Sequence, residues 1–484
     1  MKRTIALPGL VLLSACTVGP DYKGPPASLS GVAARGTFVR AADPSIRATP
    51  GLARWWDSLN DATLTALIDD ALAHSPTIDA ATASIRAARA GLAAQRAAGL
   101  PSVSATASYL HAELPGTGIA GGSGGGSSET SGSEGMSALD YYNLGGIASW
   151  EPDLFGAGRR GVEQARAMLA GRFADLADAQ VSLTAQVAQA YVNLRGTQQQ
   201  MRLTAQSTAL QRRALALMRQ RYAAGTASAL DVERLQSQLD GTEARNRPLA
   251  AQADGYLDQI AVLTGRAPGA LDATLSTAAP VPLPPATVPV GDPATLIAQR
   301  PDIRSAERAL AASSAQIGID KAKLFPSIRF LGVLGLGGPA PGDVVDIGSL
   351  TTLLAPSLNL GLLDFGRKKA AVRKSEAERD RAEAQYRTAV LTALDDAETS
   401  LSRFGNTRLQ LAQLLRAEES ATRAARLNGQ RVQAGTSTLI DQLDIERQQL
   451  QAAIAVAQAS AQLTSNYIAV QKSLGLGWAT PAAR

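Results

Sequence analysis

The sequence predicts a mainly α-helical chain that also contains four β-strands, and three observations support this fold class. Apolar residues make up 45% of the 484 residues but aromatic residues only 4%, so small and unbranched side chains that favour helices dominate. Two very long segments repeat their apolar side chains at helical spacing and contain no proline. Four shorter segments instead alternate apolar with small or polar side chains, which is typical of strands.

Residues 1–15 are typical of a bacterial lipoprotein signal peptide. Lys2 and Arg3 precede an apolar run that is too short to span a bilayer, and the four residues that end at Cys16 are typical of the cleavage site. We therefore expect Cys16 to begin the mature chain and to carry covalent lipid. Cys16 is the only cysteine, so no disulfide can form within the chain. Thr17 stands where an aspartate would favour the inner membrane, which points to the outer membrane.

Composition and motifs exclude several classes of function. The net charge is +5, from 47 basic and 42 acidic residues that are interspersed along the chain, so no basic patch for nucleic acid is indicated. His74 and His111 are the only histidines and lie in different predicted elements, and no motif of a serine hydrolase or a zinc protease is present. We expect no enzyme activity, no metal site, no nucleic-acid partner and no cofactor other than the lipid on Cys16.

The chain repeats its own plan. A motif that reads Arg-x-x-Ala-Gly-Thr-x-x-x-Leu-Asp from Arg221 returns from Arg431 with isoleucine in place of leucine, a shift of 210 residues (431 minus 221) without a gap. We divide the chain into two structural repeats, each with a short helix, a pair of strands and a hairpin of two long helices. The segments are an N-terminal segment at 16–75, the repeats at 76–265 and 301–475, a proline-rich linker at 266–300 and a C-terminal tail at 476–484.

Each repeat contains a very long helix that turns back into a second long helix. The apolar stripe has a period of about 3.5 residues, which favours packing of helices along their length. Gly225 and Gly435 should end the two longest helices as C-cap glycines, and the returning helices should begin near Asp231 and Asp441. An ordinary helical bundle is the alternative interpretation of these segments on their own. The hairpins are predicted at 158–264 and 366–474.

The four alternating segments are interpreted as membrane strands. Aromatic residues near their ends suit a membrane interface. Four strands are too few to close a barrel, and a bilayer tolerates no unpaired sheet edge, so three copies of the chain should share one twelve-stranded barrel. One face of a soluble β-sandwich is the alternative interpretation. The strands are predicted at 101–113, 138–153, 326–338 and 348–362.

Several motifs together resemble the outer membrane factor family, the TolC-like proteins, and in particular its lipidated branch. They are Arg54-Trp55-Trp56, Arg300-Pro301-Asp302-Ile303, Phe325-Pro326-Ser327-Ile328 and the two Ala-Gly-Thr turns. The resemblance covers nearly the whole mature chain. It implies a homotrimer whose twelve-stranded β-barrel in the outer membrane continues into a twelve-helix α-barrel in the periplasm, with an equatorial mixed domain that includes the linker and both ends of the chain.

The resemblance also implies the function of an outer-membrane channel of a tripartite efflux pump. Such a channel is a passive exit duct across the periplasm and the outer membrane, here for small molecules such as drugs or toxic compounds. Its partners would be a periplasmic adaptor protein and an energised inner-membrane transporter, besides the outer-membrane lipid. The alternatives are the exit duct of a type I protein secretion system and an envelope scaffold lipoprotein that conducts nothing.

The same resemblance assigns roles to the two turns. The periplasmic adaptor would contact the turns at the tips of the hairpins. The first turn would also supply Asp231 to links that keep the periplasmic end closed. The tip residues are Gly225, Thr226, Gly435 and Thr436.

Asp441 and Asp444 match the positions at which the family narrows its channel with a ring of aspartates. Each would occur three times around the axis, where a close ring of carboxylates constricts the pore and concentrates cations. Ser437 stands where the best-studied pattern has an arginine, so hydrogen bonds or apolar contacts would hold the tip closed instead. The alternative is that Asp441 only caps the returning helix and that Asp444 lies on a solvated face.

Overall fold

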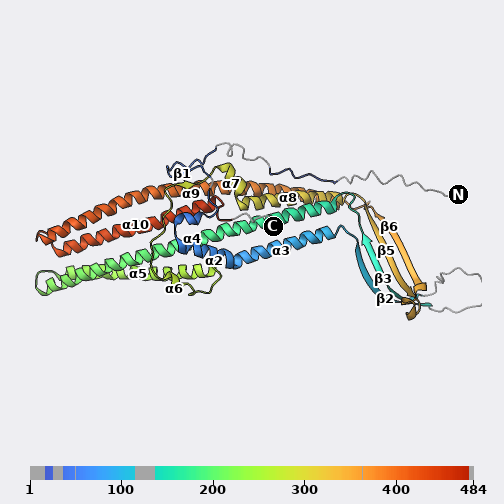
Figure 1. The fold of residues 1–484 in the computed structure, drawn as a ribbon, viewed down its shortest axis with the longest axis horizontal. Coiled ribbons are helices and arrows are strands. Elements are labelled where there is room, and N and C mark those ends of the chain that lie inside the picture. Colours follow the sequence, from blue (N-terminus) through green and yellow to red (C-terminus); the bar gives the residue numbers. More distant parts are fainter. Residues whose placement is uncertain (1–16, 26–35, 50, 115–136, 362, 479–484) are drawn as a thin grey trace, which may run out of the picture. The chain divides into compact units, whose positions relative to one another are not determined.

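The computed structural model describes residues 17–25, 36–49, 51–114, 137–361 and 363–478. Cys16 and the signal peptide lie outside these ranges. Within them, the order of the main elements repeats from one half of the chain to the other, with a short helix, two strands and two long helices (Figure 1). No helix in the described ranges is both long enough and apolar enough to cross a membrane.

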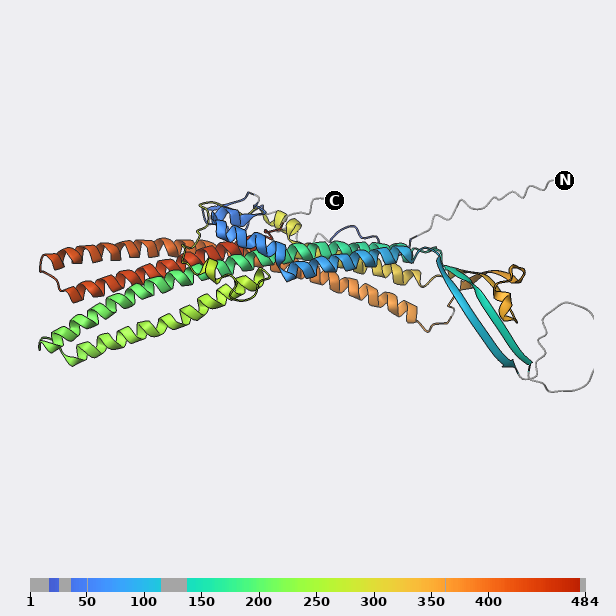
Figure 2. The same cartoon turned by 60° about the horizontal axis from the view of Figure 1, so that its bottom comes forward.

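The long helices of the two halves have the same lengths. α4 (Ala157–Ala223) and α9 (Arg367–Gln433) have 67 residues each, and the returning helices α5 (Ala229–Leu263) and α10 (Leu439–Ser473) have 35 each. The hairpins begin and end 210 residues apart (367 minus 157 and 473 minus 263), so the shift found in the sequence also relates their backbones. Figures 1 and 2 show α5 beside α4 and α10 beside α9.

Prolines and acidic caps begin several of the shorter helices. α3 and α8 each start at a proline, whose missing N–H has no partner in the first turn anyway. Asp61 accepts the N–H of Leu64 at 2.9 Å, and Asp292 accepts that of Thr295 at 2.8 Å, which caps α2 and α7. The shorter helices are η1 (Trp55–Leu59), α2 (Ala62–His74), α3 (Pro76–Ala97), α6 (Asp272–Leu275), α7 (Pro293–Gln299), α8 (Pro301–Ala322), η2 (Pro341–Val344) and η3 (Ile347–Ser349).

Four strands form one antiparallel sheet in the order β2-β3-β5-β6. Each half of the chain contributes a pair of strands, and the pairs join where β3 meets β5, from Tyr142 opposite Gly338 to Trp150 opposite Phe330. The outer edges belong to β2 and β6, and neither edge pairs with another strand among the described residues. The strands are β2 (Ser102–Leu114), β3 (Ser137–Trp150), β5 (Ser327–Gly338) and β6 (Leu350–Asn359).

The strand bounds depart from the expected ones mainly at three ends. β3 ends at Trp150 rather than at 153, because Pro152 has no N–H to donate to a neighbouring strand. β6 begins at Leu350 rather than at 348, because Asp346 caps η3 by accepting the N–H of Gly348 at 2.9 Å. β6 ends at Asn359, so the expected extension of the strand to 362 is wrong at residues 360–361, while residue 362 itself lies outside the described residues.

The chain forms two compact units, and both halves contribute to each. The sheet unit contains the described residues of 1–24, 88–169 and 310–382. The hairpin unit contains those of 25–87, 170–309 and 383–484. The compact units therefore do not coincide with the sequence repeats, because each repeat supplies two strands to the first and a pair of helices to the second.

The core of the hairpin unit is built around η1. Trp55 and Trp56 are only 1% and 2% exposed. Trp55 packs edge-on against Trp56 and Tyr467, with ring centroids 5.7 Å and 6.1 Å away. β1 (Ile46–Arg47) pairs in parallel with β4 (Val288–Pro289), so backbone hydrogen bonds join the N-terminal segment to the proline-rich linker.

Arg195 of α4 holds the start of the proline-rich linker. Its Nη1 donates to the carbonyl oxygens of Leu275 at 3.1 Å and Thr277 at 2.7 Å. Gln198, one turn further along α4, also donates to the Leu275 oxygen, at 2.8 Å. The guanidinium lies over the ring of Tyr191, 4.9 Å from its centroid. Arg195 is only 3% exposed, and a buried guanidinium is stable only when paired, so this contact fixes the linker on α4.

Replacing Arg195 by leucine should destabilise the protein by about 2 kcal/mol or more, because the Thr277 carbonyl oxygen loses its guanidinium donor and the Leu275 oxygen loses one of its two donors. Thermal unfolding of the purified full-length variant measures the effect. Arg202→Leu is the matched control, since Arg202 is an exposed arginine of the same helix that bonds only to Gln199 among the described residues. Equal melting temperatures for the two variants would show that Arg195 does not hold the linker.

Candidate functional site

Two glycine turns close the hairpins, and we call them the first tip (between α4 and α5) and the second tip (between α9 and α10). Gly225 and Gly435 have φ of 72° and 71°, a left-handed conformation that favours glycine. The N–H of Thr226 donates to the Arg221 carbonyl at 2.8 Å, and the second tip repeats this bond. The four expected tip residues, Gly225, Thr226, Gly435 and Thr436, are all exposed, while their contact with a partner stays a prediction.

Asp231 and Asp441 cap the returning helices. One carboxylate oxygen of Asp441, Oδ2, accepts the hydroxyl of Thr438 at 2.6 Å and its N–H at 3.3 Å, and Asp231 does the same with Ser228. These hydroxyl bonds are the largest cause of the lowered pKa of both aspartates. The capping role of Asp441, which the sequence offers as the alternative to a gate, is therefore present, and both carboxylates are ionised at neutral pH.

Arginines surround the aspartates of the second tip. Arg431 of α9 and Arg221 of the first hairpin contribute to the lowered pKa of Asp441. Asp444 lies one turn beyond Asp441 on α10 and is exposed, and it accepts Nη2 of Arg447 at 2.7 Å. Sequence reasoning missed Arg447, although its position three residues after Asp444 is the spacing at which a helix brings side chains together.

The histidines occupy separate places. Nδ1 of His74 lies 2.9 Å from Asp70 in α2, and Nδ1 of His111 lies 2.7 Å from Asp140 in the sheet unit. Within the described ranges, no group of three or more histidine, cysteine, aspartate or glutamate side chains could hold a metal ion. The histidines therefore form no common site.

Residues 17–24, which follow Cys16 and which we call the N-terminal arm, pack on the start of α4. The N–H of Val18 donates to the Phe155 carbonyl at 3.2 Å. Arg160, whose side chain is 4% exposed, donates to the carbonyls of Val18 and Gly19 at 3.3 Å and to Asp21 at 2.7 Å. The arm is therefore held within the sheet unit. Cys16 itself lies outside the described residues, so its lipidation stays a prediction.

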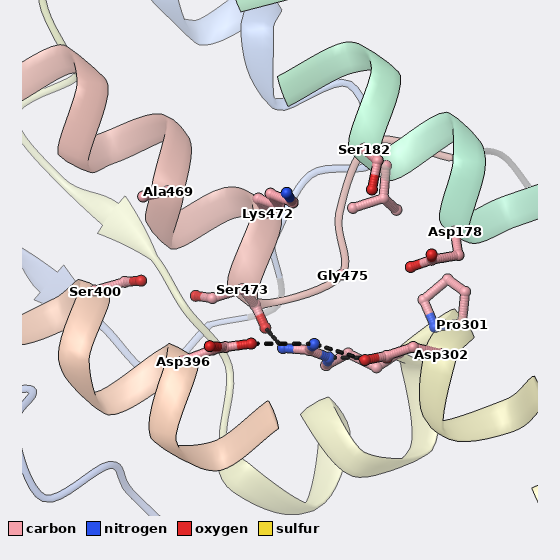
Figure 3. A pocket seen from close by; sticks show the side chains of 12 residues that line it. Asp178, Ser182, Pro301, Asp302, Asp396, Ser400, Ala469, Lys472, Ser473 and Gly475 are labelled. Carbon is pink, nitrogen blue, oxygen red and sulfur yellow. Dashed lines mark hydrogen bonds and ion pairs between the residues drawn. The ribbon is translucent and has the colours of Figure 1, made fainter. Parts of the chain in front are cut away.

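The Arg300-Pro301-Asp302 motif lines a pocket of about 220 Å³ in the hairpin unit (Figure 3). Arg300 bonds both oxygens of Asp302 at 2.9 Å and 2.7 Å, and its Nη1 donates to the carbonyl of Ser473 at 2.7 Å. Its Nη2 also lies 3.5 Å from Asp396. The motif thus joins the start of α8 to the end of α10 and to α9.

Asp178 of α4 points into the same pocket and has no hydrogen bond to a described residue (Figure 3). Burial, and then repulsion from Asp302, raise the pKa of its carboxyl group above the ordinary value. An acid whose pKa is raised by folding favours the folded state at low pH, and that contribution is lost as the pH rises through the folded-state pKa.

Asp178→Asn should therefore raise the melting temperature by about 1 to 3 °C at pH 7 to 8 and leave it nearly unchanged near pH 4. Thermal unfolding of the full-length protein across this pH range is the measurement. Asp254→Asn changes an exposed aspartate of α5 and serves as the control. A shift of equal size at both pH values would contradict the assigned cause.

The fold of this chain matches that of a solved protein of known class. A solved outer-membrane channel, OprN, superposes with a TM-score of 0.85 and 32% sequence identity, over 96% of this chain and 100% of that one. The predicted fold class, mainly α with a membrane β-barrel, is therefore confirmed as that of an outer-membrane channel.

The family follows from the sequence comparisons. The family model described as outer membrane efflux protein matches residues 67–266 and 293–476. The outer membrane protein OprJ of Pseudomonas aeruginosa is 30% identical over 96% of this chain and 94% of its own length. The toluene efflux pump outer membrane protein TtgC of Pseudomonas putida is 29% identical over the same shares. The chain belongs to the outer membrane efflux protein family, which confirms the predicted family and its outer-membrane location.

Proposed function

We propose that this chain is the outer-membrane exit duct of a tripartite efflux pump that expels small molecules. The observation that carries the proposal is the combination of an antiparallel sheet with exposed leucines and two hairpins of very long helices, within an efflux family. Leu354 and Leu358 of β6 are 73% and 68% exposed, which suits hydrocarbon better than water. The name of TtgC, a toluene efflux pump protein, supports a small molecule as the cargo.

The proposed assembly is a homotrimer. The edges of β2 and β6 have no partner strand among the described residues, and a bilayer cannot satisfy such edges. If β6 of one copy pairs with β2 of the next, three copies close a barrel of twelve strands, an even number within the range of bacterial barrels. The long helices of the three copies would then supply a twelve-helix tunnel through the periplasm.

Partners and an anchor complete the proposal. The exposed Gly225-Thr226 and Gly435-Thr436 turns would contact a periplasmic adaptor, and an energised inner-membrane transporter would supply the driving force. Lipid on Cys16 would enter the outer membrane next to the sheet unit, because the arm that begins at Thr17 packs on that unit. The chain itself would act as a passive duct.

The gate is proposed at the second tip. Asp441 and Asp444 of three copies would form two close rings of carboxylates, which narrow the pore and attract cations. Asp441 can cap the helix and line the gate at the same time. Among the described contacts, the cap involves only its Oδ2 atom. Arginines lie near both rings, Arg447 beside Asp444 and Arg431 and Arg221 near Asp441, so each ring attracts cations less strongly than its carboxylates alone would.

The duct requires that the detergent-solubilised protein be a trimer that conducts ions in a planar bilayer. Native mass measurement and single-channel recording on the same lipidated preparation test both properties. A trimer with stable conductance supports an efflux duct. A folded monomer, or a trimer without conductance, would instead support an envelope scaffold.

Asp441→Asn combined with Asp444→Asn should raise the single-channel conductance and weaken block by a multivalent cation by about threefold or more, because the rings lose their charge. Asparagine at 441 can still accept the Thr438 bonds, so the helix cap is retained. Asp240→Asn, on α5, is the control for a charge change elsewhere on a hairpin. Unchanged conductance and block in the double variant would remove both aspartates from the gate.

A further inference from the structure

The second tip contains a buried network of amide side chains. Asn428 of α9 and Gln442 of α10 are 6% and 9% exposed, and Nδ2 of Asn428 donates to Oε1 of Gln442 at 2.9 Å. Ser437, in the turn, donates its hydroxyl to Oδ1 of Asn428 at 2.9 Å. The network therefore connects the turn and both helices of the hairpin.

Gln442 completes the network with its own amide nitrogen. Its Nε2 donates to the carbonyl of Ala425 at 3.1 Å and to Oε1 of Glu446 at 2.8 Å. Both amide groups thus donate and accept, so little hydrogen-bonding capacity is left unused. Such a satisfied network stabilises a single arrangement of its helices, because any other would leave buried amides unpaired.

The first tip has the same backbone but cannot form this network. The corresponding residues, 210 positions earlier, are Ala227, Met218 and Val232 in place of Ser437, Asn428 and Gln442. The helices of the two hairpins have equal bounds at this shift, so the difference lies in the side chains alone. Apolar contacts are non-directional and tolerate rotation and sliding of one helix against another.

The network lies beside the proposed gate. Gln442 follows Asp441 directly in α10 and precedes Asp444 by two residues, within the first helical turns after the tip. Each residue of an α-helix is rotated by a fixed angle from the one before it. Fixing Gln442 against α9 therefore also fixes the directions in which both aspartates point. Ser437, which stands where the best-studied pattern of the family has an arginine, takes part in this arrangement.

We propose that Ser437, Asn428 and Gln442 are positioning residues of the gate, which orient Asp441 and Asp444 by fixing α10 against α9. The inference rests on the proposed gate and extends it, since it makes the second hairpin tip a rigid body that moves as a whole when the duct opens. The first tip, without the network, is the more adaptable of the two.

The test converts the second tip to the chemistry of the first with Ser437→Ala, Asn428→Met and Gln442→Val in one full-length variant. We expect backbone amides of residues 425–446 to exchange hydrogen about tenfold faster. We also expect less uniform single-channel conductance and cation block weakened by about threefold or more, while trimer mass is unchanged. If the triple variant does not assemble, Ser437→Ala alone is the milder variant. Ser437→Thr keeps the hydroxyl, so its cation block should equal that of the unmodified protein.

The matched control breaks an exposed bond between the same two helices. Gln449 of α10 donates to the hydroxyl of Thr422 of α9 at 3.2 Å, and Thr422→Val with Gln449→Leu removes this bond. Faster exchange in the triple variant with unchanged conductance and block would show a merely structural network and overturn the positioning role. Unchanged exchange would overturn it as well.

The Asp441→Asn and Asp444→Asn double variant separates the two proposals. If it changes block while the triple variant does not, only the positioning role fails. If it leaves block unchanged, the gate fails and the positioning role fails with it. A weakened block in both variants, with the Thr422 and Gln449 control unchanged, supports both.

Discussion

The backbone N–H and C=O groups along the outer edges of β2 and β6 need hydrogen-bond partners, and no strand among the described residues supplies them. Each unpaired group in hydrocarbon costs several kcal/mol, whereas water would surround the exposed leucines of β6 unfavourably. In the proposed trimer, further copies of the chain pair these edges, and the hydrocarbon of the membrane surrounds the leucines.

Duplication supplies two hairpins of equal length, and side chains then make them different. Each tip contains a glycine in the left-handed conformation. In each, the aspartate of the first helical turn, Asp231 or Asp441, accepts the same pair of hydrogen bonds from the N-cap residue. Only the second adds buried amides, which restrict how its helices can pack. A duct built from duplicated hairpins can thus place its narrowest point on one hairpin and leave the other adaptable.

Buried arginines hold the irregular segments on the regular ones. Arg160 bonds the N-terminal arm, Arg195 bonds the proline-rich linker, and Arg300 bonds the end of α10. In each case a guanidinium donates to backbone carbonyls that lie outside a helix or in its last residue, where no helical N–H is available to bond them. Arg160 and Arg195 thus position irregular segments on α4, and Arg300, at the C-cap of α7, joins the end of α10 to the start of α8.

The sequence by itself determined the helices, the strands, the glycine turns and the helix caps, because each depends on residues a few positions apart, as Thr438 and Asp441 do. The repeat also predicted two hairpins of one plan. Only the tertiary structure decided that β3 pairs with β5, that Arg195 meets the linker and that Ser437, Asn428 and Gln442 share one network. These contacts join elements through packing, and no local pattern of hydropathy encodes which buried side chains of two packed helices face each other.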